Sequence, residues 1–213
     1  MNTIMKKGFI FDIDGTLYSQ KAMRMKMLKR LLFFYAVRPN RLKELFALKS
    51  FRELREMDEW KQARFEDLYH EISKKTTLPV TKIERTIQYW MFQAPLDIIN
   101  KCSYQDVVSY VNEQHRNGKK VIIYSDYPAI EKLNVIGIEY DLVFAFGVDG
   151  INEQKPSLQI MEKIVSESGL TADQLLYVGD RDDRDKASAE LVNISYCDIQ
   201  TFKQMIIQQE NNK

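Results

Sequence analysis

Residues 8–16 read Gly8-Phe9-Ile10-Phe11-Asp12-Ile13-Asp14-Gly15-Thr16. The continuous apolar run predicts a strand over residues 8–14 that is buried on both faces, as in a parallel sheet. Asp12 and Asp14 are two residues apart, so their side chains lie on the same side of the strand end. Open α/β sheets bind ligands at this edge. Two carboxylates in one site need a cation between them, or one must keep its proton.

The turn that follows the two carboxylates offers backbone N–H groups at Gly15 and Thr16, which are suited to an anion. The alternative is a strand that ends in a solvated, Asp-rich turn without chemical function. The segment by itself leaves both interpretations open, so the rest of the chain has to distinguish them.

Strand-like and helix-like segments alternate from residue 103 to the end of the chain. This alternation is typical of βαβ units and predicts an α/β fold with a Rossmann-like parallel sheet flanked by helices. The expected strands are 120–124, 140–146, 174–178 and 194–199, and the expected helices are 103–118, 158–165 and 202–209.

Residues 19–100 have a different pattern, rich in Leu, Met, Lys, Arg and Glu, with Pro39, Pro79 and Pro95 as expected helix breaks. They predict several helices and no clear strand. We therefore expect two domains: an α/β core from residues 1–18 and 101–213, and an inserted helical domain from residues 19–100.

The later strands also end in residues suited to phosphate chemistry. Ser125 follows one strand, Lys155 precedes a helix, and Asp180 follows another strand, with Asp185 five residues later. A hydroxyl can bond a phosphoryl oxygen, and an ammonium can offset carboxylate charge. A set of oxygen ligands favours a hard cation such as Mg²⁺.

In these residues the chain resembles the haloacid dehalogenase superfamily, whose four ordered motifs are matched by Asp12-Ile13-Asp14-Gly15-Thr16, Ser125, Lys155 and Gly179-Asp180 with Asp185. The match covers the α/β part, about residues 1–18 and 101–199. In this superfamily an insertion after the first motif forms a helical cap of the C1 type, which closes over the site. The resemblance therefore implies that residues 19–100 are such a cap.

The resemblance also implies roles for the site residues. Asp12 would be the nucleophile that forms an aspartyl-phosphate, and Asp14 would protonate the leaving oxygen and later activate water. Thr16, Ser125 and Lys155 would hold the phosphoryl group. The implied Mg²⁺ ligands are Asp12, Asp180 and the main-chain carbonyl of Asp14, with Asp185 as a ligand or its support.

The implied activity is that of a Mg²⁺-dependent phosphatase acting on a small phosphorylated metabolite. Asp14 favours phosphoester chemistry over dehalogenation, because an alkoxide leaving group needs a proton and a halide does not. Two alternatives stay open. The same residues can serve a phosphomutase or phosphotransferase, and the chain can be a weakly active binding or membrane-surface module.

Three acidic residues near the motifs have no assigned role. Asp126 stands where relatives often have Asn, and it either changes substrate orientation or adds a negative charge. Asp182 and Asp183 either compete as metal ligands or form surface pairs with arginine, and we expect the pairs.

Composition excludes several functional classes. The net charge of +1 gives no overall basic field, so we expect no nucleic-acid partner. Two cysteines, Cys102 and Cys197, are too few for a disulfide framework or a four-cysteine zinc site, and two histidines exclude a multi-histidine metal centre. The apolar stretch after the basic first residues is interrupted by Asp12 and is too short for a secretory signal, so we expect a cytoplasmic protein.

The helical segment is basic. Residues 19–100 contain 17 Lys and Arg against 10 Asp and Glu, a net charge of +7, which leaves −6 for the rest of the chain. This asymmetry suits a lid over an anionic substrate. Residues 23–34 also resemble a cationic amphipathic helix, but we interpret them as buried core and expect no membrane contact. Trp60 and the run Tyr89–Phe92 are candidate pocket aromatics, with core packing as the alternative. The sequence sets no oligomeric state.

Overall fold

The computed structural model describes residues 6–210. The chain divides into two compact units, which we call the core unit and the helical unit. The core unit comprises the chain up to Gln20 and from Cys102 onward, and the helical unit is Lys21–Lys101. Each unit has its own set of packed elements.

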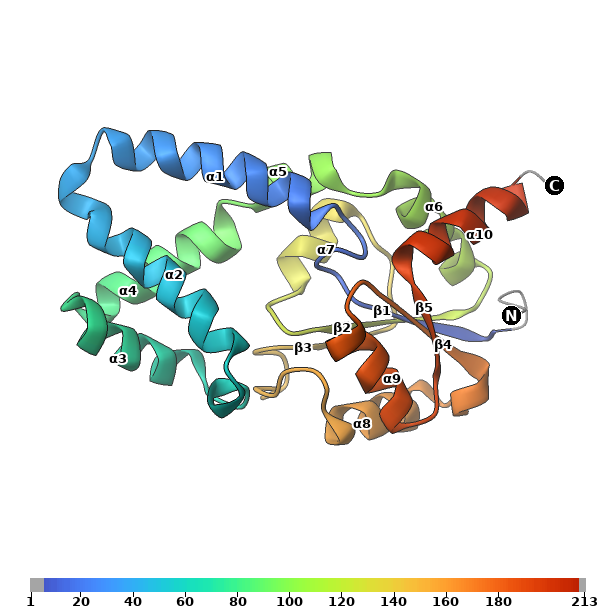
Figure 1. The fold of residues 1–213 in the computed structure, drawn as a ribbon. Helices are drawn as coiled ribbons and strands as arrows, with labels where there is room; N and C mark the ends of the chain where they lie inside the picture. Colours follow the sequence, from blue (N-terminus) through green and yellow to red (C-terminus); the bar gives the residue numbers. More distant parts are fainter. Residues whose placement is uncertain (1–5, 211–213) are drawn as a thin grey trace. The chain divides into compact units, whose positions relative to one another are not determined.

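The core unit is built on a parallel sheet that has five strands among residues 6–210, in the order β3-β2-β1-β4-β5 (Figure 1). The strands are β1 Gly8–Phe11, β2 Lys120–Ser125, β3 Leu142–Ala145, β4 Leu175–Gly179 and β5 Ser195–Asp198. The predicted α/β fold with a Rossmann-like parallel sheet is confirmed. The strand order places β1 in the centre, between β2 and β4.

β1 is shorter than the predicted strand 8–14. Its four residues are buried, as expected for a central strand covered on both faces. After Phe11 the chain bends out of the sheet into the turn that carries the two carboxylates, and the N–H of Asp12 still donates to the carbonyl of Val178 at 3.1 Å. The strand therefore ends at the edge where its polar residues begin.

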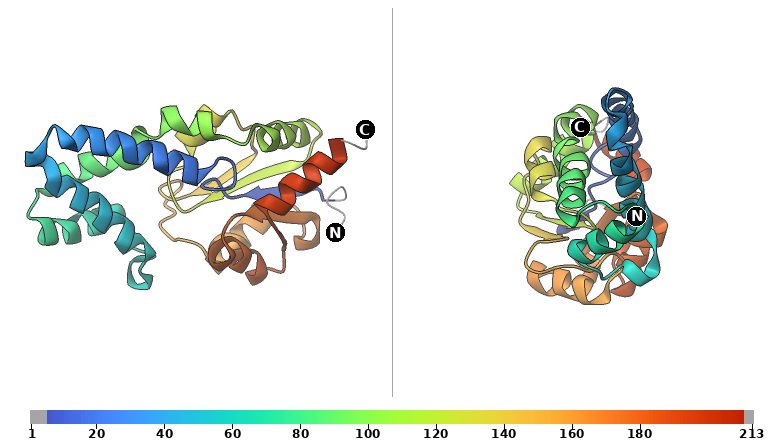
Figure 2. Two further views of the ribbon diagram at one scale, coloured as in Figure 1. Left: turned by 45° about the horizontal axis from the view of Figure 1, so that its top comes forward. Right: turned by 90° about the vertical axis from the view of Figure 1, so that its left-hand side faces the viewer.

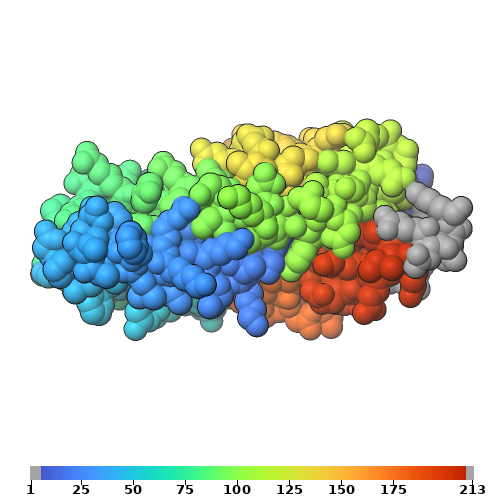
Figure 3. All heavy atoms as spheres, turned by 90° about the horizontal axis from the view of Figure 1, so that it is seen from above, coloured from blue at the N-terminus to red at the C-terminus, as the bar shows by residue number. Residues whose placement is uncertain are grey.

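Helices cover both faces of the sheet. α6 and α10 lie side by side on one face, and α8 and α9 on the other (Figures 1 and 2). Seen from above with all atoms drawn, α10 (red) adjoins α6 (yellow-green) (Figure 3). The helices of this unit are α6 Gln105–Arg116, α7 Ile130–Ile136, α8 Leu158–Ser168, α9 Ala187–Leu191 and α10 Ile199–Glu210, with a π-helical turn at Asp182–Lys186. The sequence analysis did not predict α7, because seven residues are too few to show a clear helical period.

The helical unit contains α1 Gln20–Ala36, which begins one residue before the boundary, α2 Leu42–Glu56, α3 Phe65–Thr76, α4 Val80–Ile87 and α5 Leu96–Ile99. A π-helical segment, Gln88–Gln93, continues α4. No strand occurs among the described residues of this unit, in agreement with the pattern of residues 19–100. Its core is aromatic: the Phe65 ring stacks on Phe92 and meets Phe51 edge to face.

The candidate pocket aromatics have different positions. Trp90 and Phe92 are buried in the core of the helical unit, whereas Tyr89 is about half exposed. Trp60 is partly buried and donates its indole N–H to Glu59. Core packing therefore accounts for Trp90 and Phe92.

α1 is more exposed than we expected for residues 23–34. It buries only Met27 and Tyr35, while Leu32 and Phe33 are 60% and 78% exposed. The interpretation of this segment as buried core is therefore wrong for most of its residues, because the helix has apolar side chains on more than one face. Among the described helices, none has the length and apolar character needed to cross a membrane.

The buried side chains of β1 should contribute strongly to the free energy of unfolding of the core unit. Ile10 has no exposed surface, and Ile10→Ala is expected to lower the free energy of unfolding by about 2–5 kcal/mol, because it leaves a cavity beside the sheet. Chemical denaturation followed by circular dichroism measures this change. The matched control is Ile207→Ala on α10, where the side chain is 51% exposed and the change should stay within about 0.5 kcal/mol. Equal effects of the two variants would contradict the assignment of β1 as the central strand.

Candidate active site

The sheet register aligns the ends of three strands that carry predicted site residues. Phe11 pairs with Ile123 and with Val178. Asp12 follows β1, Ser125 ends β2, and Asp180 follows β4, so all three stand at the carboxyl edge of the sheet. Open α/β sheets bind ligands at this edge, as we predicted for Asp12.

Lys155 lies at the centre of this edge. Its ammonium Nζ donates to Asp12 Oδ1 at 2.7 Å and to Asp185 Oδ1 at 2.8 Å, and the residue is only 1% exposed. Burial disfavours the charged ammonium, but the negative charges of Asp12 and Asp185 outweigh it and hold the pKa of Lys155 well above its ordinary value. Lys155 is therefore a permanent buried cation that links the first and fourth motifs.

Asp12 is a buried carboxyl with few charge-stabilising contacts. Besides Lys155 it accepts a hydrogen bond from the Thr16 hydroxyl at 3.1 Å on Oδ2. Burial raises the pKa of Asp12 to about 8; the charges of Asp185 and Asp14 add to this increase and Lys155 opposes it. An additional cation nearby would stabilise the ionised form.

Such a cation has a place among the acidic side chains. Carboxylate oxygens of Asp12, Asp180 and Asp185 lie within 4.8 Å of one another. Asp180 keeps part of its side chain in water, yet partial desolvation and the charge of Asp185 raise its pKa to about 6. These groups offer only oxygen, the donor that hard divalent cations prefer. The three residues therefore form a candidate centre for a divalent metal.

Gly15 makes room for this cluster. It adopts φ +108°, and a Cβ there would stand 2.0 Å from Asp180 Oδ2. A side chain would therefore strain the turn and collide with a carboxylate of the cluster.

Asp185 is already bound by several donors. Its Oδ1 accepts from Lys155 and, at 3.2 Å, from the Tyr177 hydroxyl; its Oδ2 accepts the N–H groups of Asp180 and Arg181, both at 3.1 Å. These contacts fix the carboxylate and the loop after β4. They favour the supporting role for Asp185 over direct ligation.

Asp14 has hydrogen-bond partners of its own. Lys132 Nζ is 2.7 Å from both carboxylate oxygens, and the Tyr18 hydroxyl donates to Oδ1. Burial opposes ionisation, but the ammonium of Lys132 outweighs it and lowers the pKa of Asp14 below its ordinary value. Burial and neighbouring charges therefore shift the pKa values of the two first-motif carboxylates in opposite directions.

The predicted phosphate-binding residues are at the same edge. Ser125 is buried, and its hydroxyl oxygen accepts the N–H of Tyr127 at 3.3 Å. Thr16 is also buried, with its hydroxyl directed to Asp12. The structure thus brings together Asp12, Thr16, Lys155, Asp180 and Asp185 through mutual contacts, while Asp14 and Ser125 flank them on adjoining loops.

Asp126 holds the loop of Lys155. Its Oδ1 accepts the backbone N–H of Lys155 at 2.7 Å, and its Oδ2 accepts from Arg184 at 2.8 Å. Arg184 also donates to Gln154 at 2.8 Å. The negative charge of Asp126 is therefore matched by a buried arginine from the fourth motif, and the two residues join the loops that follow β2, β3 and β4.

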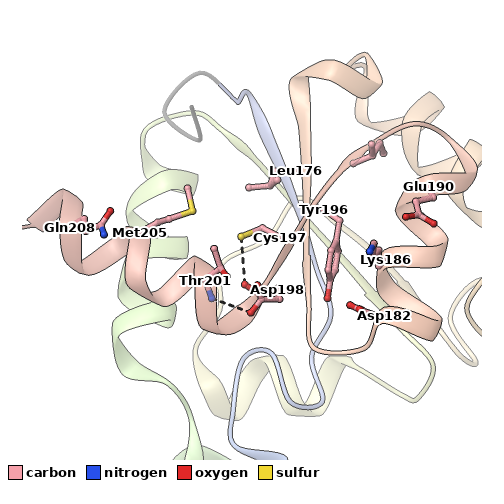
Figure 4. A pocket seen from close by; sticks show the side chains of 11 residues that line it. Leu176, Asp182, Lys186, Glu190, Tyr196, Cys197, Asp198, Thr201, Met205 and Gln208 are labelled. Carbon is pink, nitrogen blue, oxygen red and sulfur yellow. Dashed lines mark hydrogen bonds between the residues drawn. The ribbon is translucent and has the colours of Figure 1, made fainter. Parts of the chain in front are cut away.

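The two remaining acidic residues do not join the cluster. Asp183 forms the expected surface pair, at 2.7 Å from Arg181. Asp182 lines a separate pocket of about 920 Å³ beside edge strand β5, together with Lys186, Tyr196 and Thr201 (Figure 4).

The chemical character of this pocket differs from that of the acidic cluster. The residues that line it do not include Asp12, Asp14, Lys155 or Asp180. Cys197 lies in it, and burial raises the pKa of its thiol to about 11, so the sulfur is protonated at neutral pH. The pocket therefore offers no activated nucleophile.

A family model described as haloacid dehalogenase-like hydrolase matches residues 9–199. The match extends across both units and includes every residue of the acidic cluster. This chain belongs to the haloacid dehalogenase-like hydrolases. The resemblance predicted from the four motifs is thereby confirmed. No curated protein matches this hydrolase.

Solved structures support the same fold at low sequence identity. A 2-haloacid dehalogenase from Pseudomonas syringae pv. Tomato DC3000 has a TM-score of 0.66 at 14% identity, covering 96% of this chain and 99% of that one. YfnB from Bacillus subtilis, a protein of the same superfamily, has a TM-score of 0.60 at 16% identity, covering 94% and 96%. A HAD phosphatase from Thermococcus onnurineus has a TM-score of 0.52 at 18% identity, covering 89% and 84%.

The sequence analysis missed several residues of this hydrolase site. Lys132 and Tyr18 bind Asp14, and Arg184 binds Asp126. Tyr18 stands four residues after Asp14, and Arg184 lies within the fourth motif, so both were near motifs already recognised. Lys132 is in the unpredicted α7, and no local sequence signal points to it.

The raised pKa of Asp12 has a consequence for stability. An acid whose pKa rises from 3.8 to about 8 on folding stabilises the folded state at low pH, and this contribution is lost as the pH rises toward about 8. In metal-free protein, Asp12→Asn is therefore expected to raise Tm at about pH 8 and to change it much less at about pH 5. Thermal unfolding in the presence of a chelator measures both values.

The control for this experiment is Asp183→Asn, which changes an exposed carboxylate paired with Arg181. It should give no gain in Tm at either pH. A lower Tm for Asp12→Asn than for wild type at about pH 8 would contradict the unfavourable ionisation of Asp12.

Proposed function

We propose that this hydrolase is a Mg²⁺-dependent phosphatase that cleaves a small phosphorylated metabolite through an aspartyl-phosphate on Asp12. The observation that carries the proposal is the pair of carboxylates, Asp12 and Asp14, each in contact with a buried lysine of its own and Asp12 also within an acidic cluster. A nucleophile, a proton carrier, a fixed cation and a metal centre are the parts that phosphoester hydrolysis needs. We also propose that the core domain is residues 1–18 and 101–213 and that residues 19–100 form the cap.

The metal centre fits Mg²⁺. Its donors are oxygens only, and Gly15 leaves space where a Cβ would collide with Asp180. Asp12, Asp180 and the main-chain carbonyl of Asp14 would hold the ion, with Asp185 fixing the loop. Bound Mg²⁺ would neutralise carboxylate and phosphoryl charge and keep Asp12 ionised. The YfnB structure, described as bound to magnesium, supports the proposal by analogy.

In the first step an oxygen of Asp12 attacks phosphorus, the bond from phosphorus to the ester oxygen breaks, and Asp14 gives its proton to the leaving oxygen. Lys155 offsets the negative charge of the phosphoryl group as it moves. Asp14 is ionised in the free protein, so the proton that it gives to the leaving oxygen has to come from the substrate. A phosphate monoester can supply this proton, because it keeps its last proton up to about pH 6.

In the second step water attacks the phosphorus of the aspartyl-phosphate. Asp14, now a carboxylate, accepts a proton from that water; the bond between phosphorus and Asp12 breaks, and inorganic phosphate leaves. Ser125 and the N–H of Gly15 would bind phosphoryl oxygens at this edge of the sheet, whereas the N–H of Thr16 already donates to the carbonyl of Ile13 at 3.2 Å.

Asp14 is also the reason to prefer phosphoester cleavage to dehalogenation. Displacement of a halide requires a nucleophile but no proton donor, so the role of Asp14 as an acid is needed only where an ester oxygen leaves. The relatives of known fold include both dehalogenases and phosphatases, so the substrate has to be tested directly.

A panel of phosphomonoesters, including p-nitrophenyl phosphate and sugar phosphates, tests the proposal. Wild type is expected to release inorganic phosphate in the presence of Mg²⁺ and to stop when the metal is chelated. Asp12→Asn should lose activity by a factor of about 10³ or more, because the covalent route is removed. The matched control Asp183→Asn should keep wild-type activity.

Other outcomes would replace the proposal. Halide release from a 2-haloacid without phosphate release would make the chain a dehalogenase. Isomerisation of a sugar phosphate without phosphate release would make it a mutase. Full activity of Asp12→Asn, purified free of wild type, would remove Asp12 as the nucleophile.

A further inference from the structure

We propose that Lys132 is a positioning residue for Asp14, which it holds in place to accept the proton of the water that cleaves the aspartyl-phosphate. This inference rests on the proposed function and assigns a second lysine to the site. Lys132 lies outside the four motifs and comes from α7.

The geometry of this contact is specific. Lys132 Nζ stands 2.7 Å from each oxygen of Asp14, and both side chains are largely buried, with 8% and 15% of their surfaces exposed. The contact joins positions 118 residues apart in the chain. The Tyr18 hydroxyl binds the same carboxylate on Oδ1. Asp14 is therefore held from two sides in a single orientation.

The division of charge within the site supports a functional role. Lys155 is bound to Asp12 and Asp185, and Lys132 is bound to Asp14. Each carboxylate of the first motif thus has its own ammonium. A hydrophobic side chain at position 132, in the first turn of α7, would pack there without the free-energy cost of burying a charge. The buried lysine is explained if Asp14 needs a fixed cation.

The position of the ammonium fixes the geometry of the second step. Contact with both oxygens holds the plane of the carboxylate, so that Asp14 keeps one orientation while it accepts a proton from water. Without Lys132, the Tyr18 hydroxyl would be the remaining hydrogen-bond donor to this carboxylate among the described residues, and the negative charge of Asp180 would repel it. It would then leave the position from which it can reach the attacking water.

The test uses p-nitrophenyl phosphate, whose leaving group departs without a proton, so that formation of the aspartyl-phosphate does not depend on Asp14. Lys132→Met is expected to show a rapid burst of p-nitrophenol equal to the enzyme concentration, followed by slow turnover. The steady-state kcat should fall about a hundredfold, as expected for a displaced catalytic group. Acid-quenched protein should carry phosphate on Asp12, detected by intact mass.

Two further variants separate positioning from folding. Lys132→Arg should restore most of kcat and remove the burst, because a guanidinium can bind both oxygens of a carboxylate. Lys163→Met is the matched control: Lys163 pairs with Glu167 on the surface of α8, and its loss should change neither kcat nor the burst. A cooperative thermal transition shows that each variant is folded; if Lys132→Met is not, Lys132→Gln takes its place.

Each outcome has a clear meaning. Wild type that releases no p-nitrophenol refutes the proposed function and this inference with it. If wild type is active, two results for a folded Lys132 variant refute this inference and leave the proposed function intact. The first is an unchanged kcat. The second is a lower kcat with neither a burst nor trapped phosphate.

Discussion

The buried ammonium of Lys155 between Asp12 and Asp185 is the contact on which the site depends. Without it, carboxylates from two separate loops would repel one another in a region that water hardly reaches. The contact requires the loops after β1, β3 and β4 to meet at one sheet edge, which the parallel register provides. Asp126 and Arg184 then fix the loop of Lys155 from the other side. The position of the buried lysine therefore depends on the sheet, on the loops at its edge and on the carboxylates that these loops carry.

The sequence predicted the strands and the first-motif carboxylates because their signals are local. Continuous apolar runs mark buried strands, and Asp12, Ser125 and Asp180 each follow such a run directly. Lys132 was not predicted, because it contacts Asp14 only through the fold: the two residues are 118 positions apart in the sequence. Asp126 was recognised as unusual, but its role depends on a buried arginine 58 residues away.

The helical unit shows another limit of periodicity. The pattern of residues 23–34 indicates a helix and α1 is one, yet the pattern does not say which apolar face has a packing partner. Met27 and Tyr35 are buried, whereas Phe33 is exposed. Exposure is decided by the neighbouring helices, whose packing is set by aromatic residues such as Phe51 and Trp90 in later segments.

Gly15 and Gly179 restrict how this chain can diverge. A Cβ at Gly15 would meet Asp180, and one at Gly179 would stand 2.4 Å from the Cβ of Asp185. Alanine at either position would therefore disturb the acidic cluster. The exposed surface of α1 carries no such restriction. Substitutions on the exposed face of α1 should therefore be tolerated more readily than substitutions of these two glycines.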